Sequence, residues 1–230
     1  MPSSFAKVLM AVVSGGACLV GPLSGAARAD VLQSGGNTPG VIDDIAAGVK
    51  EFGFETNFQL AYDKLGDDSA WRLGGMIGPT FRYFLIDRLS LGINGSFMYR
   101  RAESIGLDST LGGLGSIGID YHLPLKGGLF LYPGISLGGF YGKRELRPDA
   151  GDATIFTRSS TYGGVARAGL GLIFYPSDSF NMFARPEAVI LLGKNGDVEV
   201  STAGQPTQSG SSGLYLSVDA SFNVGMSFVF

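Results

Sequence analysis

Residues 214–230 place an apolar side chain at nearly every second position. Successive side chains of a β-strand point to opposite faces, so this segment predicts a strand with one apolar and one polar face. The same alternation recurs along the chain, and no helical period of comparable length competes with it. Eight strands are predicted, at residues 51–63, 70–83, 89–100, 109–123, 129–142, 160–175, 180–192 and 214–230.

Residues 1–29 have the pattern of a secretory signal peptide. One cation, Lys7, precedes an apolar stretch from Val8 to about Val20, and small residues then lead to Ala29. The apolar stretch is too short and too interrupted by glycine for a membrane-spanning helix. We expect cleavage before Asp30, so that the mature chain leaves the cytoplasm.

The composition of the mature chain excludes several kinds of site. Cys18 is the only cysteine and lies in the signal segment, so disulfides and thiolate ligands are excluded after cleavage. Loss of Lys7 and Arg28 reduces 17 basic residues to 15, against 20 acidic ones, which gives a net charge of −5. Nucleic acid is a poor partner for such an acidic chain. With a single histidine as well, we expect no metal site and no cofactor.

The polar face of the predicted strands indicates which environment surrounds them. No run of about 18 apolar residues is present, and a membrane chain without a spanning helix must be a closed barrel, because unpaired backbone groups in hydrocarbon are costly. A soluble barrel with an apolar interior is the alternative. However, the polar positions carry mostly Gly, Ser, Thr and Asn rather than the many ions of a solvated exterior. Aromatic residues also gather toward both strand ends, as at two membrane interfaces. The predicted fold is an eight-stranded antiparallel up-and-down transmembrane β-barrel over residues 50–230.

The connections between predicted strands alternate in length. Short turns are expected at 84–88, 124–128 and 176–179. Transmembrane barrels have short periplasmic turns and longer outer loops, so both chain ends are expected in the periplasm. The longer, outer connections are residues 64–69, 101–108, 143–159 and 193–213.

Residues 30–49 are predicted to be a flexible periplasmic segment. Val41, Ile42, Ile45 and Val49 share one face at helical spacing, after start signals that include a proline. Two alternatives remain open here, a short amphipathic helix and a frayed leader. The helix would lie on the membrane surface or under the barrel mouth.

Several features together resemble the small eight-stranded outer-membrane barrels of Gram-negative bacteria, the family that includes outer membrane protein A. They are the signal peptide, the strand count, the turn segment 83–92 and the ending Phe228-Val229-Phe230. The resemblance implies an outer-membrane location, with lipid and lipopolysaccharide around the barrel. It also implies that the barrel-assembly machinery reads the C-terminal strand through Met226, Phe228 and Phe230. Members of this family are anchors, adhesins, small channels and a few enzymes, so fold alone does not decide activity.

Charged residues are expected to fill the barrel interior. Eight strands enclose a space just wide enough for side chains or one small ligand. Opposite charges on adjacent strands compensate each other, so five inward ions near mid-height are predicted to form an ion-pair network that closes the pore. These five are Glu55, Arg167, Arg185, Glu187 and Asp219; the other inward ions are Arg72, Arg82, Arg100, Asp120 and His122.

Three functions are consistent with these features. The favoured one is a structural or surface-interaction role with a largely filled lumen, in which 143–159 and 193–213 meet an extracellular partner. A narrow channel for small solutes is the alternative, because many inward positions are glycine. A lipid-modifying enzyme using His122 is the third. This histidine lies beside a predicted periplasmic turn, whereas resembling lipid-modifying barrels carry catalytic groups toward the outer leaflet. We therefore expect no enzymatic activity.

Overall fold

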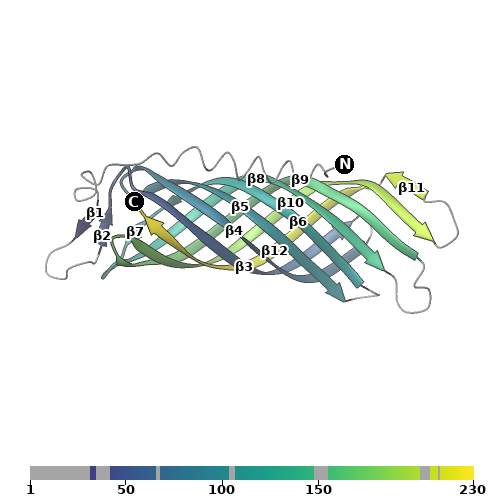
Figure 1. Cartoon of the computed structure of the whole chain (residues 1–230), viewed down its shortest axis with the longest axis horizontal. Helices are drawn as coiled ribbons and strands as arrows, with labels where there is room; N and C mark the ends of the chain where they lie inside the picture. Colours follow the sequence, from purple (N-terminus) through teal and green to yellow (C-terminus); the bar gives the residue numbers. More distant parts are fainter. Residues whose placement is uncertain are drawn as a thin grey trace.

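The computed structural model describes residues 32–34, 42–65, 68–103, 107–147, 155–202, 208–211 and 213–230. Eight long strands form a tilted barrel wall (Figure 1). These wall strands are β3 (Lys50–Leu65), β4 (Asp68–Ile86), β5 (Leu89–Glu103), β6 (Leu107–Tyr121), β8 (Leu129–Arg147), β9 (Ile155–Ser177), β10 (Phe180–Thr202) and β12 (Leu214–Val229). The shorter strands are β1 (Leu32–Ser34), β2 (Ile42–Ile45), β7 (Leu123–Pro124) and β11 (Gln208–Ser211).

The eight wall strands form a closed antiparallel ring. Each one pairs with its neighbours in chain order, and β12 returns to pair with β3. At this seam Val229 lies opposite Glu51, and Lys50 and Phe230 exchange two backbone hydrogen bonds of 2.9 Å. Because the ring is closed, every wall strand pairs with a neighbour on both sides. Its backbone N–H and C=O groups are therefore hydrogen-bonded without water.

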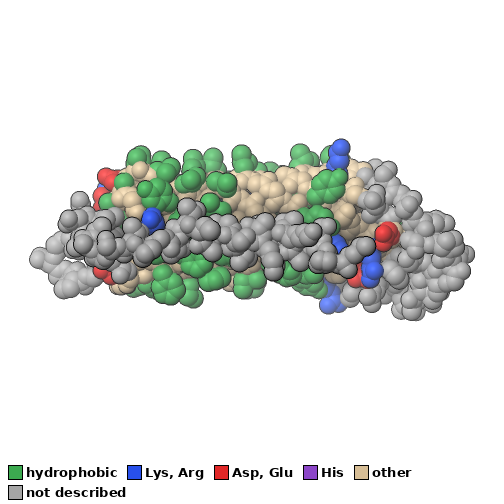
Figure 2. Space-filling view, turned by 45° about the horizontal axis from the view of Figure 1, so that its top comes forward, with side chains coloured by type: hydrophobic (Ala, Val, Ile, Leu, Met, Phe, Trp, Pro, Cys, Tyr) green, Lys and Arg blue, Asp and Glu red, His purple; other side chains and the backbone are tan. Residues whose placement is uncertain are grey.

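Alternate side chains of the wall point into and out of the barrel. On β12, Asp219 and Ser221 are buried, whereas Val218 and Phe222 on either side of them are about half exposed. Figure 2 shows the result, with hydrophobic side chains spread over the outer surface and charged ones toward the two ends. None of the described residues belongs to a helix long and apolar enough to cross a membrane.

The predicted strands are all present, and most are longer than predicted. β9 and β10 have 23 residues each, well beyond the roughly 9–11 that a tilted strand needs to cross a bilayer. Their pairing continues past the expected rim, because Arg158 of β9 lies opposite both Glu145 and Glu199. β11 adds a further strand to β10 there (Figure 1). Much of the two long predicted loops is therefore β-ribbon; residues 148–154 and 203–207 lie outside the described part.

The helix predicted as one alternative for residues 41–49 is wrong. Ile42–Ile45 forms β2, which pairs antiparallel with β1. A turn follows, in which Gly48 has a φ of 89°, a left-handed conformation that a right-handed helix does not contain. The apolar residues that suggested a helical face are instead used to contact the barrel end. The predicted signal peptide, residues 1–29, lies outside the described residues.

Candidate functional site: a filled barrel lumen

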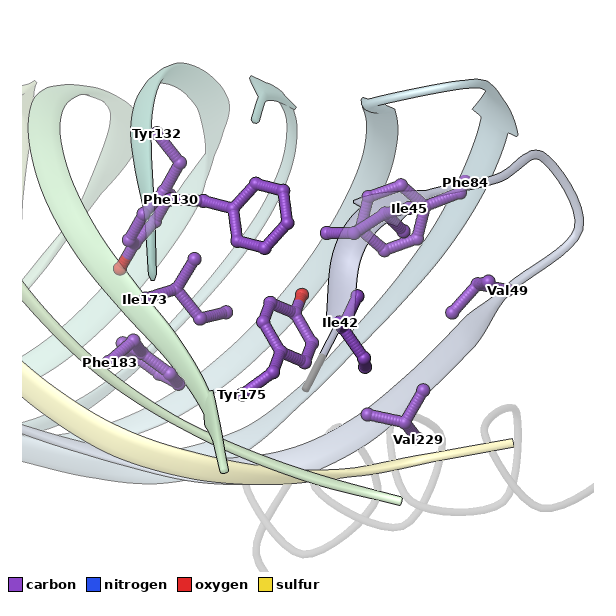
Figure 3. Packing of buried hydrophobic residues seen from close by; sticks show 10 residues of the cluster. All are labelled: Ile42, Ile45, Val49, Phe84, Phe130, Tyr132, Ile173, Tyr175, Phe183 and Val229. Atoms are coloured by element: carbon purple, nitrogen blue, oxygen red, sulfur yellow. The ribbon is translucent and has the colours of Figure 1, made fainter. Parts of the chain in front are cut away.

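Residues 42–49 close one end of the barrel, and we call this segment the plug. Ile42, Ile45 and Val49 are at most 2% exposed. Figure 3 shows them pointing toward aromatic and aliphatic side chains of the wall strands. The complete end cluster is Ile42, Ile45, Val49, Phe84, Phe130, Tyr132, Ile173, Tyr175, Phe183 and Val229.

The plug is fastened to the turn between β4 and β5. The Arg88 amide donates to the Ile45 carbonyl at 3.0 Å, and its guanidinium contacts both Asp44 oxygens, at 2.7 and 2.6 Å. The Ala47 amide donates to Asp87 Oδ1 at 2.9 Å. Hydrogen bonding to Arg88 lowers the pKa of the Asp44 carboxyl below its ordinary 3.8. Arg88 has a φ of 65°, uncommon for a residue with a side chain, and this conformation belongs to the turn that meets the plug.

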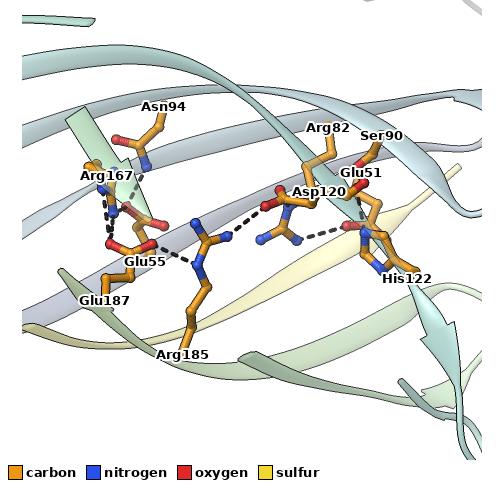
Figure 4. A network of polar contacts seen from close by, with 10 residues as sticks. All are labelled: Glu51, Glu55, Arg82, Ser90, Asn94, Asp120, His122, Arg167, Arg185 and Glu187. Atoms are coloured by element: carbon orange, nitrogen blue, oxygen red, sulfur yellow. Dashed lines mark hydrogen bonds and ion pairs between the residues drawn. The ribbon is translucent and has the colours of Figure 1, made fainter. Parts of the chain in front are cut away.

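Above the plug, charged side chains of alternating sign cross the lumen (Figure 4). Arg82 Nη1 lies 3.0 Å from Glu51 Oε2, and its Nε lies 3.6 Å from Asp120 Oδ2. Arg185 Nη1 contacts the other oxygen of Asp120 at 2.7 Å. Tyr175 donates its hydroxyl proton to Glu51 Oε1. The carboxylate of Asp120 thus joins two arginines from different strands.

The same chain of contacts continues through Arg185. Its Nε lies 2.8 Å from Glu187 Oε1, while Arg167 Nη2 lies 2.7 Å from Glu187 Oε2 and 3.3 Å from Glu55 Oε1. Asn94 donates to the same Glu55 oxygen. We call this set the central ion chain, and its members are Glu51, Arg82, Asp120, Arg185, Glu187, Arg167 and Glu55.

The structure brings four of the five predicted network residues together but separates Asp219 from them. Asp219 pairs with Arg100 instead. The register explains this: Asp219 lies opposite Val189, two residues beyond Glu187 along β10 and farther from the plug. At that level the cation that reaches into the lumen comes from β5.

Arg100 organises a second ion group. It donates to Ser217 Oγ at 3.1 Å and to the Tyr215 hydroxyl at 3.3 Å, and its Nη1 lies 3.6 Å from Asp63 Oδ1. Asp63 also pairs with Arg72. A second apolar cluster packs alongside, made of Met76, Met98, Leu114, Phe140, Val165, Val189, Leu191 and Tyr215.

His122 lies in the wall near the plug and is fully buried. Its Nε2 is 3.3 Å from Ser90 Oγ on the third wall strand, and its ring stacks on Tyr132 with centroids 5.6 Å apart. The Phe84 ring packs against another side of the imidazole, with ring centroids 4.9 Å apart. The backbone amide of His122 donates to the Arg88 carbonyl at 2.7 Å, which links the histidine to the turn that holds the plug.

One open space in the described part of the lumen adjoins the central ion chain. A chamber of about 40 Å³ lies beside the central ion chain and is lined by Glu55, Asp120 and the three arginines of that chain. This volume has room for a few water molecules at most. At two inward glycines the space is filled: a methyl group on Gly134 would overlap Asp120, and one on Gly171 would overlap the Tyr132 ring.

All ten predicted inward ions are buried, and two further ions are buried with them. Glu51 is 1% exposed and Asp63 5% exposed, and each joins one of the two ion groups. Both lie at odd-numbered positions of the first wall strand, as Glu55 does. The alternation of side chains therefore places them on the inward face as well. Among the described residues, no group of His, Cys, Asp or Glu side chains is arranged to hold a metal ion.

The side chains on the outer surface indicate which medium surrounds this barrel. Leu137, Phe58 and Ile135 are 60–70% exposed, although they are large apolar side chains on long, regular strands. A water-soluble barrel would turn these residues inward and its ions outward, whereas here arginines and carboxylates fill the inside. Exposed aromatic residues lie near the plug end at Phe52, Phe54, Tyr83, Tyr121, Phe174 and Phe228, and near the other end at Tyr62, Trp71, Phe97, Tyr99, Tyr141 and Tyr162.

The chain is an eight-stranded transmembrane β-barrel. Its apolar face meets lipid hydrocarbon, and its two aromatic zones match two membrane interfaces. Met226 and Phe228, predicted to form the assembly signal, lie on this face and are 53% and 61% exposed, while Phe230 is intermediate.

Known proteins resemble this barrel in structure but not in sequence. No model of a known protein family matches the chain, and no curated protein matches it. Ail of Yersinia pestis is 14% identical, with 80% of this chain and 99% of Ail covered and a TM-score of 0.46. OprG of Pseudomonas aeruginosa is 12% identical, with 80% and 97% covered and a TM-score of 0.46. Neisserial surface protein A is also 12% identical, with 76% and 95% covered and a TM-score of 0.47.

Proposed function

We propose that this outer-membrane barrel is a closed scaffold with a structural or surface-interaction role. The observation that carries the proposal is the filling of the lumen: a plug, two ion groups and two apolar clusters occupy it. A chamber of about 40 Å³ is too small to pass a solute. The long ribbons of β8, β9 and β10 extend away from the plug and offer the surface for contact with an extracellular partner.

In this proposal the plug and both chain ends face the periplasm. The short connections support this orientation: only two residues separate β4 from β5 and β9 from β10 at the plug end. The outward Met226, Phe228 and Phe230 then form the signal by which the barrel-assembly machinery recognises the last wall strand. Lipid and lipopolysaccharide surround the apolar belt.

We also propose that the barrel is not an enzyme. The only histidine, His122, is enclosed by Phe84, Tyr132 and Ser90, and its neighbourhood lies at the plug end rather than at the outer rim. A substrate would need to displace the plug before it reached the imidazole. A catalytic histidine is expected to have open access to the group whose proton it moves.

A narrow channel is the second candidate, and one observation favours it. The 40 Å³ chamber is polar and lies in line with the lumen, so rearrangement of Arg185 and the plug would extend it. This route requires breaking contacts of 2.7 and 2.8 Å between Arg185 and two carboxylates. The closed scaffold needs no such rearrangement.

Conductance across planar lipid bilayers tests the two candidates. The full mature chain should give no stable single-channel openings, with a general porin as the positive control. Arg185→Ala should also stay closed, because Arg82 and Arg167 remain in the lumen and the plug is untouched. Stable openings of the unmodified protein would contradict the closed scaffold and favour the channel.

A further inference from the structure

The plug has one part bound to the wall by backbone pairing and one part held mainly by side chains. At its C-terminal end the Gly48 amide donates to the Phe84 carbonyl at 2.8 Å, and the Phe84 amide donates to the Val49 carbonyl at 2.9 Å. Gly48 has a φ of 89°, and a methyl group placed on it would meet nothing within 4 Å. The backbone can therefore turn at Gly48 without meeting a neighbour.

The earlier part of the plug is held by Ile42, Ile45 and the latch, our name for the ion pair between Asp44 and Arg88. The two side chains of the latch are 32% and 36% exposed, so solutes in the surrounding water reach it. Arg88 adopts its φ of 65° although a glycine would do so without strain. Its guanidinium contacts both oxygens of one carboxylate, the paired geometry by which arginine recognises carboxylates. The turn thus places a carboxylate receptor at the edge of the barrel mouth.

The wall members of the end cluster form a cup under the plug, and they hold one another in place. Phe130 and Tyr175 pack edge to face with ring centroids 5.5 Å apart, and Tyr175 also donates its hydroxyl proton to Glu51. These contacts join residues of the wall, so the plug is not needed to keep the rings in position. Figure 3 shows Ile42 and Ile45 pointing toward this cup.

We propose that the cup is a binding site for a linear medium-chain carboxylate, and that the plug is its built-in occupant. Ile42 and Ile45 supply about eight apolar side-chain carbons, and burial of such carbons drives binding to an apolar cup. Asp44 supplies a carboxylate to the guanidinium of Arg88. Octanoate carries both elements in one molecule: its carboxylate takes the place of Asp44, and its chain takes the place of the two isoleucines.

Ligand binding and plug docking exclude each other at this site. The plug turns away at Gly48 as the ligand enters, and Arg88 exchanges one carboxylate for another, so its cation stays paired. Beyond the cup, Arg82 remains paired with Glu51, and the central ion chain is unchanged. The ligand occupies the barrel mouth only, so the inference goes beyond the closed scaffold without opening the lumen.

Equilibrium dialysis of radiolabelled octanoate tests the site, with the full mature chain in lipid nanodiscs at neutral pH and empty nanodiscs as the blank. The unmodified protein should bind octanoate saturably. Asp44→Asn should tighten this binding about fivefold, because it removes an exposed ion pair that holds the competing plug and leaves Arg88 free for the ligand. Asp178→Asn is the matched control, since it removes an exposed acid from the turn between β9 and β10 at the same barrel end; its binding should equal that of the unmodified protein.

One further variant and two further ligands separate the chain from the headgroup. Ile45→Ala shortens the apolar contact of the plug and leaves every wall residue unchanged, so it should tighten octanoate binding by at least the same factor. Octanol should bind about fivefold more weakly than octanoate, because it lacks the charge that Arg88 recognises. Butanoate should show no saturable binding, because its chain is too short to fill the cup.

Four results would overturn the proposal. Octanoate retained no better than by empty nanodiscs would mean that the cup takes no ligand of this class. Equal binding by the Asp44→Asn and Asp178→Asn variants would separate the site from the plug. Octanol binding as tight as that of octanoate would remove the carboxylate from recognition, and butanoate binding as tight would reduce the site to an anion contact at Arg88. Heat-modified migration in gels confirms that each variant is folded. Each of these failures leaves the closed scaffold intact, because conductance tests that proposal separately.

Discussion

Arg100 offers the sharpest test of how the buried ions stabilise this barrel. It is 1% exposed and pairs with Asp219, which is equally buried. Arg100→Met keeps most of the volume but removes the cation, and Asp63 still has Arg72. An unpaired buried charge costs about 3–5 kcal/mol. The unpaired carboxylate can avoid this cost by taking up a proton. Protonating a carboxyl of ordinary pKa at pH 7 costs about 4 kcal/mol, so the cost of the unpaired charge stays in the same range. We expect unfolding free energy to fall by about 3–4 kcal/mol.

A second substitution separates charge from packing. Asp219→Asn in the Arg100→Met background removes the unpaired carboxylate, so the double variant should be more stable than Arg100→Met alone by about 2 kcal/mol. Arg158→Met is the control, because it breaks an exposed pair whose loss should cost less than about 1 kcal/mol.

The chain contains its own probe for these measurements. Trp71 is the only tryptophan, and it lies on the lipid-facing side of β4 with 64% exposure. Urea unfolding from lipid vesicles, followed by its fluorescence, gives the free energy of each variant. The reasoning fails if Arg100→Met lies within about 1 kcal/mol of the unmodified protein, or if the two substitutions are additive.

The remaining predictions concern the plug and the packing of the lumen. Because the mature chain is expected to contain no cysteine, Ile45→Cys should resist a water-soluble thiol reagent while the exposed Ala47→Cys reacts quickly; rapid labelling of both would show that the plug does not stay docked. The lowered pKa of Asp44 means that its contribution to docking is fully present above its ordinary pKa of 3.8 and is lost as the pH falls through the lowered value. Labelling of Ile45→Cys by a pyridyl disulfide, which reacts in acid, should therefore rise at low pH, and this rise should be absent when Asp44→Asn is added; an unchanged rise would remove the ion pair from the explanation. Gly171→Ala should cost about 1–3 kcal/mol in the urea assay because the added methyl group overlaps an aromatic ring, whereas the outward Gly115→Ala should be nearly neutral, and equal effects would contradict a filled lumen.

Most of the fold could be predicted from the alternation of side chains. A period of two residues assigns every position of a wall strand to one of two faces, so Glu55, Arg167 and Arg185 could be placed inside before any partner was known. Charge-poor polar positions then indicated that the other face meets lipid. These are local properties of sequence, and the structure agrees with them.

The partners of the inward ions could not be predicted in the same way. Which ions meet depends on strand tilt and stagger, which set the height of each residue in the lumen. Asp219 therefore contacts Arg100 on β5 instead of joining the other four residues of the predicted network. A position of residues 41–49 under the barrel mouth was one of the alternatives left open, but their conformation was predicted wrongly for a related reason. Ile42 and Ile45 have a helical spacing, but the barrel end offered them an apolar cluster that only the folded wall creates.

The seam between β3 and β12 has a consequence for assembly. The ring closes through pairing of its earliest and latest strands, so the most distant contacts along the sequence are also the ones that complete the wall. Such non-local closure is slow, since much chain entropy is lost before any contact compensates it. A nascent polypeptide cannot finish this step until β12 has been made. The plug immediately precedes β3 in the chain, so it is held next to this seam when the last pair of strands forms.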